Sequence, residues 1–64
     1  MSQHQVLFEF IRQGAYMKVS AIDTRTNTEV SIVGPASAGE VVLKTNVLRK
    51  LEYVMEKNRR ARGG

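Results

Sequence analysis

The chain has 64 residues and a formal net charge of +4, and its 42% hydrophobic and 25% charged residues are the balance of a globular chain. This length accommodates one small domain and leaves little room for the cleft of a multi-residue catalytic site. The chain has no cysteine, which excludes disulfides and cysteine-based metal sites. No apolar run approaches the length of about 18 residues that crosses a membrane, and no signal peptide is visible, so we expect a cytoplasmic protein.

The positive charge is concentrated toward the C-terminus. Residues 44–64 contain seven basic and two acidic residues, whereas residues 1–43 contain three basic and four acidic ones. The high isoelectric point therefore comes mostly from the last part of the chain. We expect residues 1–58 to form a single domain and residues 59–64 to form a basic, flexible tail that ends in glycine.

Two alternating segments near the start predict a β-hairpin. Apolar side chains occupy every second position in residues 6–12 and again in residues 16–22, which is the period of a strand. Residues 13–15 contain a glycine and supply the turn between them. One face of this hairpin should lie in the core, through Val6, Phe8, Phe10, Met17, Val19 and Ala21.

A polar loop and a third strand follow. Residues 23–28 are Asp, Thr, Arg and Asn, and the Asp, Thr and Asn side chains bond their own backbone in turns. The next segment, residues 29–33, alternates again and directs Val30 and Ile32 toward the core. The dipeptide Gly34-Pro35 is expected to end this strand.

The remaining sequence predicts a long amphipathic helix. Ser37 and Glu40 have the spacing of a capping box, in which each side chain bonds the backbone N–H of the other residue. Apolar residues then recur at three- and four-residue intervals, which predicts a helix from about residue 38 to 58. These residues are Leu43, Val47, Leu48, Leu51, Val54 and Met55.

The β-branched pair Val41-Val42 supports a competing interpretation of the same segment. In that interpretation residues 40–44 form a fourth strand, and the helix begins after Asn46. We prefer the single helix. It gives an α+β fold of the order β-β-β-α, a three-stranded antiparallel meander followed by one C-terminal helix packed on one face of the sheet.

The second face of this sheet is more apolar than exposure to solvent requires. Polar Glu9, Lys18 and Ser20 alternate there with large apolar side chains. Such a face predicts a surface covered by a second copy of the chain or by another protein. We expect the interface to contain Leu7, Ile11, Tyr16, Ile22 and Val33.

Two segments resemble a known family. Residues 18–35, KVSAIDTRTNTEVSIVGP, and residues 48–54, LRKLEYV, are similar to a family of short, uncharacterised proteins found mainly in alphaproteobacteria. The resemblance spans residues 6–57. It implies a compact bacterial domain and assigns no activity.

No motif in the chain predicts catalysis. The two glycines Gly34 and Gly39 have the spacing of a phosphate loop, but Glu40 and Val41 stand where that motif needs Lys and Ser or Thr. His4 is the single histidine and has no cysteine or second histidine with which to share a metal. We therefore expect a non-enzymatic protein with no catalytic residue, no cofactor and no metal.

The C-terminal cations support alternative functions. Lys57, Arg59, Arg60 and Arg62 could bind nucleic-acid phosphates without sequence preference. More remotely, the ending Arg62-Gly63-Gly64 is similar to that of ubiquitin-like modifiers and sulfur carriers, although in those proteins the tail leaves a strand. The preferred prediction remains an interaction module, homodimeric or bound to a protein partner.

Overall fold

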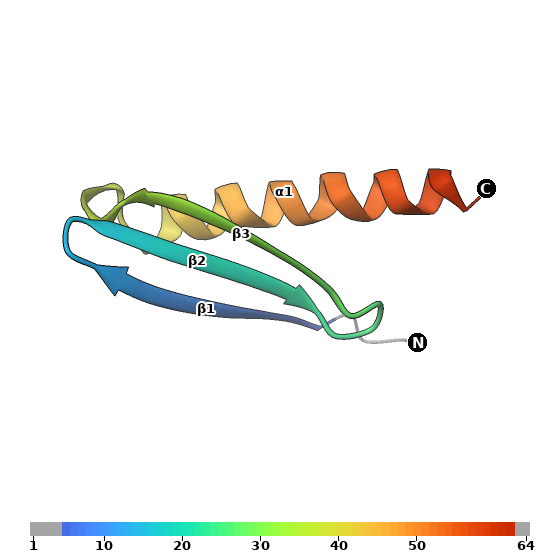
Figure 1. The fold of residues 1–64 in the computed structure, drawn as a ribbon, viewed down its shortest axis with the longest axis horizontal. Coiled ribbons are helices and arrows are strands. Elements are labelled where there is room, and N and C mark those ends of the chain that lie inside the picture. Colours follow the sequence, from blue (N-terminus) through green and yellow to red (C-terminus); the bar gives the residue numbers. More distant parts are fainter. Residues whose placement is uncertain (1–4, 63–64) are drawn as a thin grey trace.

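The computed structural model describes residues 5–62, which form three strands and one helix. The elements are β1 (Val6–Gln13), β2 (Tyr16–Asp23), β3 (Thr28–Pro35), a short 3-10 turn η1 (Ala36–Ala38) and α1 (Glu40–Ala61). The strands form one antiparallel sheet in the order β1-β2-β3, and α1 lies along one of its faces (Figure 1). The predicted α+β fold of the order β-β-β-α is confirmed.

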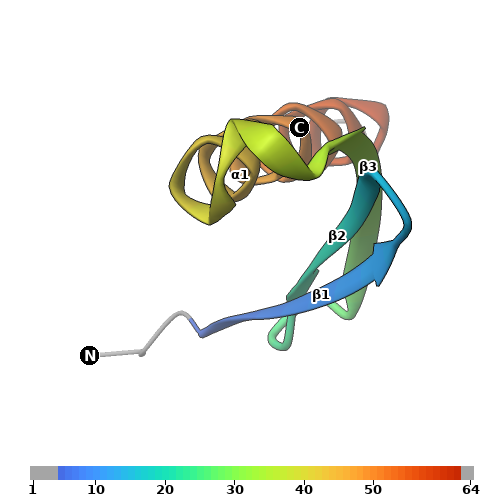
Figure 2. The ribbon, with the colours of Figure 1, turned by 90° about the vertical axis from the view of Figure 1, so that its left-hand side faces the viewer.

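The helix covers the sheet unevenly. It packs mainly on β2 and β3, whereas β1 lies at the far edge of the curved sheet (Figure 2). As a result Val6, Phe8 and Phe10 of β1 are only half-buried, although they face the same side as the core. The buried core between the sheet and α1 consists of Val19, Ala21, Val30, Leu43, Val47 and Leu51.

Strand β3 ends at Pro35 and includes Gly34, so it runs two residues past the predicted end at residue 33. Proline is tolerated there because β3 is an edge strand, with a strand neighbour on one side only. Gly34 has a different reason to be small. A Cβ atom at this position would lie 2.6 Å from Cδ2 of Leu43, so the missing side chain lets α1 approach β3.

The start of α1 differs from the predicted capping box. Ser37 lies within η1, and no side chain caps the helix; Gly39 is the N-cap residue, with φ of 90°. Its carbonyl accepts the first helical hydrogen bond from the backbone N–H of Leu43, at 3.2 Å. The competing fourth strand over residues 40–44 is also wrong, because these residues are helical from Glu40 onward.

The helix ends at Ala61, later than the predicted end near residue 58. Arg59 and Arg60 therefore belong to α1 rather than to a tail. Both donate to the carboxylate of Glu56 one turn earlier, which stabilises the last turn, and cations there also complement the helix dipole. In the part of the chain that the structure describes, no helix is both long enough and apolar enough to cross a membrane.

The connection between β2 and β3 is organised by the buried side chain of Asp23. Its Oδ1 accepts hydrogen bonds from the backbone N–H groups of Arg25 and Thr26, at 2.9 and 3.1 Å, as in an Asx turn. The backbone N–H and the hydroxyl of Thr24 both donate to the carbonyl of Gln5, at 3.1 and 3.0 Å. These hydrogen bonds fix the conformation of the loop that carries Arg25, and they attach the loop to Gln5, the residue before β1.

Candidate functional site

The first candidate site is the outer face of the sheet, which is the face opposite α1. Strand alternation and register place on it all five residues that the sequence analysis predicts for an interface: Leu7, Ile11, Tyr16, Ile22 and Val33. Four of them are exposed by 41% to 67%, and the fifth, Ile22, is half-buried. The sheet therefore brings these apolar side chains, which come from all three strands, onto one face.

This outer face has two apolar ends separated by a polar row. At one end Leu7 pairs with Ile22. The row nearer the other end is Ile11, Lys18 and Val33. Between them lies the polar row Glu9, Ser20 and Ser31. The two serine hydroxyls lie 3.0 Å apart and bond each other, so each of them has a hydrogen-bond partner within the chain.

Three charged side chains share the outer face, namely Glu9, Lys18 and Glu29. None of them has an ion-pair partner in the described part of the chain. Lys18 stands on the central strand between two apolar neighbours, and Glu29 lies next to Ile22. The face thus carries both signs of charge beside apolar side chains, which is the composition that a self-complementary interface needs.

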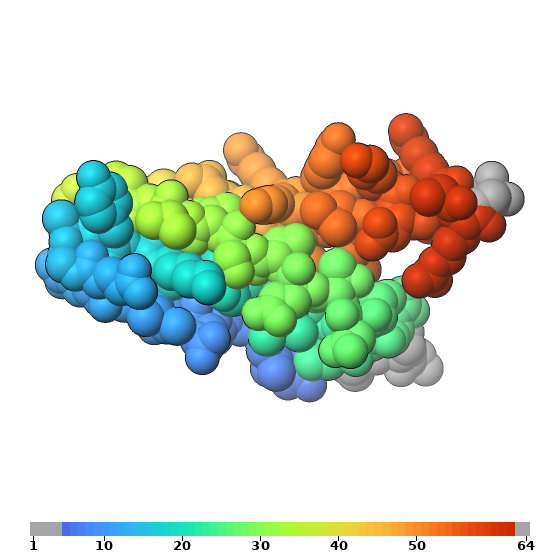
Figure 3. All heavy atoms as spheres, in the orientation of Figure 1, coloured from blue at the N-terminus to red at the C-terminus, as the bar shows by residue number. Residues whose placement is uncertain are grey.

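The second candidate is a hollow between the β2–β3 hairpin and the C-terminal end of α1, visible as a gap in Figure 3. Its volume is about 400 Å³. We call it the arginine hollow, and its lining residues are Arg25, Thr26, Thr28, Met55, Asn58, Arg59 and Arg62. The lining includes three arginines and no carboxylate, so its formal charge is positive.

The arginine hollow joins cations that are distant in the sequence. The sequence analysis predicted Arg59 and Arg62 for an anionic ligand but missed Arg25, which comes from the hairpin loop. No local pattern could indicate Arg25, because its place beside the helix end depends on tertiary packing. The other two predicted cations, Lys57 and Arg60, are exposed on α1 and do not line the hollow.

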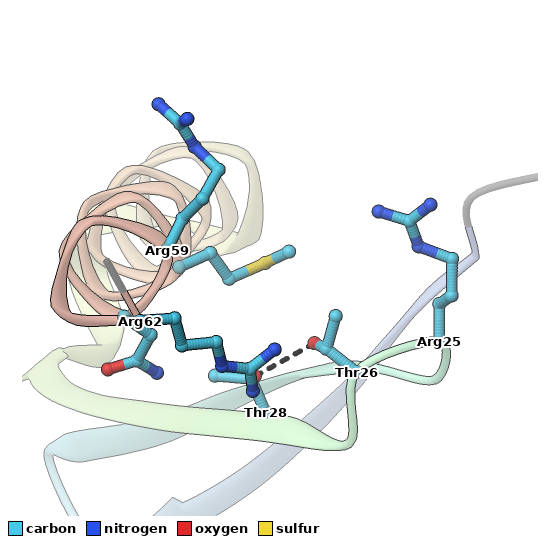
Figure 4. Close-up of a pocket in the computed structure, with 7 residues that line it drawn as sticks. Arg25, Thr26, Thr28, Arg59 and Arg62 are labelled. Carbon is cyan, nitrogen blue, oxygen red and sulfur yellow. Dashed lines mark hydrogen bonds between the residues drawn. The ribbon is translucent and has the colours of Figure 1, made fainter. Parts of the chain in front are cut away.

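The arginines of the hollow are not equivalent. Arg62 reaches toward Thr26 and Thr28, whereas Arg59 is directed away from these threonines (Figure 4). The Arg59 guanidinium is held by Glu56, with Nε–Oε1 and Nη2–Oε2 distances of 3.3 and 2.6 Å. This hydrogen bonding lowers the pKa of Glu56 and raises the pKa of Arg59. Much of the charge on Arg59 is therefore compensated within the chain.

A third candidate, a smaller groove of about 290 Å³, runs between β1 and α1. Its lining is formed by Val6, Leu48, Leu51, Glu52, Met55, Glu56 and Arg59. Farther along the same side, Nζ of Lys44 lies 4.7 Å from the centre of the Phe8 ring, a cation–π contact that partly covers β1. This groove follows from the offset of α1 toward β3.

Comparison with known proteins identifies the family to which the chain belongs. A sequence model described as a domain of unknown function (DUF6898) matches residues 3–58. The chain belongs to this family. The expected membership of an uncharacterised family is therefore confirmed, and the match includes the whole sheet and most of α1. No curated protein and no solved structure matches the chain.

Two features named in the sequence analysis lie outside the described residues. These are His4 and the diglycine Gly63-Gly64, so the structure offers no geometry for the ubiquitin-like or sulfur-carrier hypothesis. Within residues 5–62, no three His, Asp or Glu side chains are grouped so as to hold a metal ion.

Proposed function

We propose that the chain is a non-enzymatic interaction module that forms a homodimer through the outer face of its sheet. The observation that carries this proposal is the exposure of Leu7, Ile11, Tyr16 and Val33, by 41% to 67%, on a single face. Large apolar side chains exposed together on one face of a small domain mark an interaction site, because their burial removes about 25 cal/mol per Å² of unfavourable contact with water.

Charge complementarity favours a second copy of the chain as the partner. Consider a face-to-face dimer whose two-fold axis lies between the two sheets, perpendicular to the strands and level with Ser20. This axis places the cross-strand row that contains Lys18 in one copy over the row that contains Glu29 in the other. Lys18 of one copy then lies over Ile22 of the second copy, next to Glu29 on the adjacent strand, and two-fold symmetry forms this pair twice. Neither side chain has an ion-pair partner within its own chain, in the part that the structure describes.

The same axis also matches the apolar ends of the face. It turns Leu7 of one copy over Ile11 of the other, and it leaves the polar serine row at the centre of the interface. The Lys18–Glu29 pairs and the apolar contacts on either side of the centre fix one orientation, because a shift of the register would separate Lys18 from Glu29.

The small core supports self-association. Among the described residues only six hydrophobic side chains are buried. Domains of this length bury only about 60% of the surface that their unfolded chains expose, and oligomerisation is one of the means by which they gain stability. Covering the outer face would give β2, the central strand, a second packed surface.

The molar mass in solution tests the homodimer. Light scattering across a concentration series, in about 0.15 M salt, should give twice the chain mass of 7.2 kDa. Ile11→Lys and Val33→Lys each add a cation next to Lys18, so both variants should be monomeric with unchanged helical circular dichroism. The matched control is Tyr53→Lys, on the exposed side of α1, which should remain dimeric.

Two results would contradict the homodimer. A wild-type chain that is monomeric at every concentration would leave the face to a heterologous partner. If both lysine variants remain dimeric, the interface does not lie on the outer face of the sheet. The unpaired edge of β1 would then be the next surface to test.

We also propose that the protein is bacterial and acts in the cytoplasm. This proposal rests on the resemblance to short alphaproteobacterial proteins and on the absence of cysteine, which suits a reducing compartment. Fractionation of cells that express the tagged chain tests it, with the expected signal in the cytoplasmic fraction. Recovery from the periplasm would contradict it.

A further inference from the structure

We propose that the arginine hollow is a phosphate-binding site that holds the backbone of a nucleic-acid strand. The hollow lies between the β2–β3 hairpin and the end of α1, away from the outer face of the sheet. The proposal is therefore independent of the homodimer, and the two can fail separately.

The first reason is the supply of uncompensated guanidinium groups. Arg25 and Arg62 line the hollow and have no ion-pair partner in the described part of the chain. Each guanidinium presents a planar fork of N–H donors that matches two oxygens of a phosphate. The Arg59 guanidinium already donates to Glu56, so it adds positive charge at the rim of the hollow but has fewer N–H groups left for a phosphate.

The second reason is the set of neutral donors between these arginines. The hydroxyls of Thr26 and Thr28 lie 2.8 Å apart and share one hydrogen bond (Figure 4). One hydroxyl donates to the other, so the second keeps its hydrogen for a ligand oxygen. The side-chain amide of Asn58 adds two more donors from the helix.

The third reason is that the hairpin wall of the hollow is preorganised. The backbone N–H of Arg25 is bonded to Asp23, and Thr24 is bonded to the carbonyl of Gln5. On the helix side, the pair between Arg59 and Glu56 stabilises the turn from which Arg62 extends. A ligand would therefore order two arginine side chains and not a loop, which reduces the entropy lost on binding.

The size of the hollow and the charge around it favour a strand of nucleic acid over an isolated phosphate. A volume of about 400 Å³ lies in the range of sites that hold molecules larger than an ion, so a phosphate with its attached sugar fits. Lys57 is exposed on another side of the same end of α1 and is the remaining cation there, because Arg60 shares Glu56 with Arg59. A neighbouring phosphate of one strand could contact Lys57, which a single anion in the hollow could not do.

Fluorescence anisotropy of the full chain with labelled single-stranded DNA and RNA homopolymers of about twelve nucleotides tests the proposal, with salt varied from about 50 to 200 mM. We expect salt-dependent binding by the wild-type chain. Arg25→Gln and Arg62→Gln should each weaken binding about five- to tenfold and reduce the salt slope by about one. Arg25→Lys keeps the charge but loses the fork, so it should weaken binding less than Arg25→Gln.

The matched control is Arg49→Gln, which removes one charge from α1 at an exposed position outside the hollow. Its binding should stay within about twofold of the wild type. Arg25 is the decisive position, since a site made only of the C-terminal helix end predicts no effect there. Circular dichroism of each variant checks that the fold is retained.

Several outcomes would overturn the proposal. One is the absence of binding to both oligonucleotides; another is equal weakening by Arg25→Gln and Arg49→Gln, which would indicate diffuse charge attraction. Binding of a polyglutamate peptide, or of vesicles that contain phosphatidylglycerol, as tightly as the oligonucleotides would assign the hollow to an acidic protein or a membrane surface instead. Competition by inorganic phosphate, at constant ionic strength, should be weak because it lacks the neighbouring phosphates.

Discussion

Gly34 shows how one missing side chain sets the distance between β3 and α1. Adding a Cβ atom there brings it within 2.6 Å of Cδ2 of Leu43, which is buried in the core. The dipeptide Gly34-Pro35 predicts a strand end, and no local pattern indicates the contact with Leu43, which arises only when the helix packs back onto the strand. The requirement for glycine is thus a matter of packing and not of backbone conformation.

We predict that Gly34→Ala lowers the free energy of unfolding by about 1–3 kcal/mol, since the clash must be relieved by moving Leu43 or α1. Urea denaturation followed by circular dichroism measures the change. The control is Leu43→Val, whose cost should be smaller in the Gly34→Ala background than in the wild type. Strictly additive costs would show that the two side chains do not meet.

Lys18 and Glu29 provide a residue-scale test of the proposed dimer. Lys18→Glu and Glu29→Lys each replace two intermolecular attractions with two repulsions, so each should weaken dimerisation about five- to thirtyfold. The double variant restores opposite charges and should return to within about threefold of the wild-type dissociation constant. Analytical ultracentrifugation measures all four proteins. If the double variant is as weak as the two losses combined, the charges do not pair across the axis.

At the scale of elements, the two ends of α1 differ in what the sequence could predict. The apolar repeat predicts the helix itself, because residues three and four positions apart share a face. The start was predicted wrongly because Ser37 and Glu40 have the spacing of a capping box. In the structure Ser37 lies within η1, and Gly39 is the N-cap residue of α1. A short 3-10 turn before a helix leaves no spacing signal of its own.

The far end of α1 has a pH dependence that can be measured. The hydrogen bond from Arg59, with a smaller contribution from Arg60, lowers the pKa of Glu56 from its usual 4.5. The support that Glu56 gives to the last turn is therefore complete above pH 4.5 and is lost as the pH falls through the lowered pKa. We predict that amide exchange of the last turn accelerates in this acidic range.

An NMR titration of the Glu56 carboxyl group measures this effect directly. Its midpoint should lie below 4.5 in the wild type and move toward that value in Arg59→Ala. In Glu56→Gln, the exchange rates of the last turn should no longer respond to pH through this carboxylate. A Glu56 midpoint that Arg59→Ala leaves unchanged would show that the ion pair does not form in solution.

At the scale of the whole molecule, a dimer makes thermal stability depend on concentration. If the outer faces pair, mass action raises the Tm of the wild type as its concentration rises, whereas a monomeric Val33→Lys variant keeps one Tm. Differential scanning calorimetry over a hundredfold range of concentration provides the measurement. A wild-type Tm independent of concentration would argue against a dimer in which association and folding are coupled.

The sequence by itself determined the element order and the composition of both sheet faces. Alternation in residues 6–12 and 16–22 assigns each side chain to one face without any knowledge of the fold, because the strand period of two is local. For this reason all five outer-face residues, Leu7 to Val33, were predicted correctly in position. The helix repeat likewise predicted the buried residues of α1.

Only the tertiary structure decided where α1 lies on the sheet. Its offset toward β3 leaves β1 half-covered, brings Leu43 close to Gly34, and brings the end of the helix beside the hairpin loop. Arg25 and Arg62 consequently line one hollow, although they lie far apart in the chain. Local periodicity specifies which face of an element is buried, whereas the position of a helix across a sheet depends on packing between distant residues.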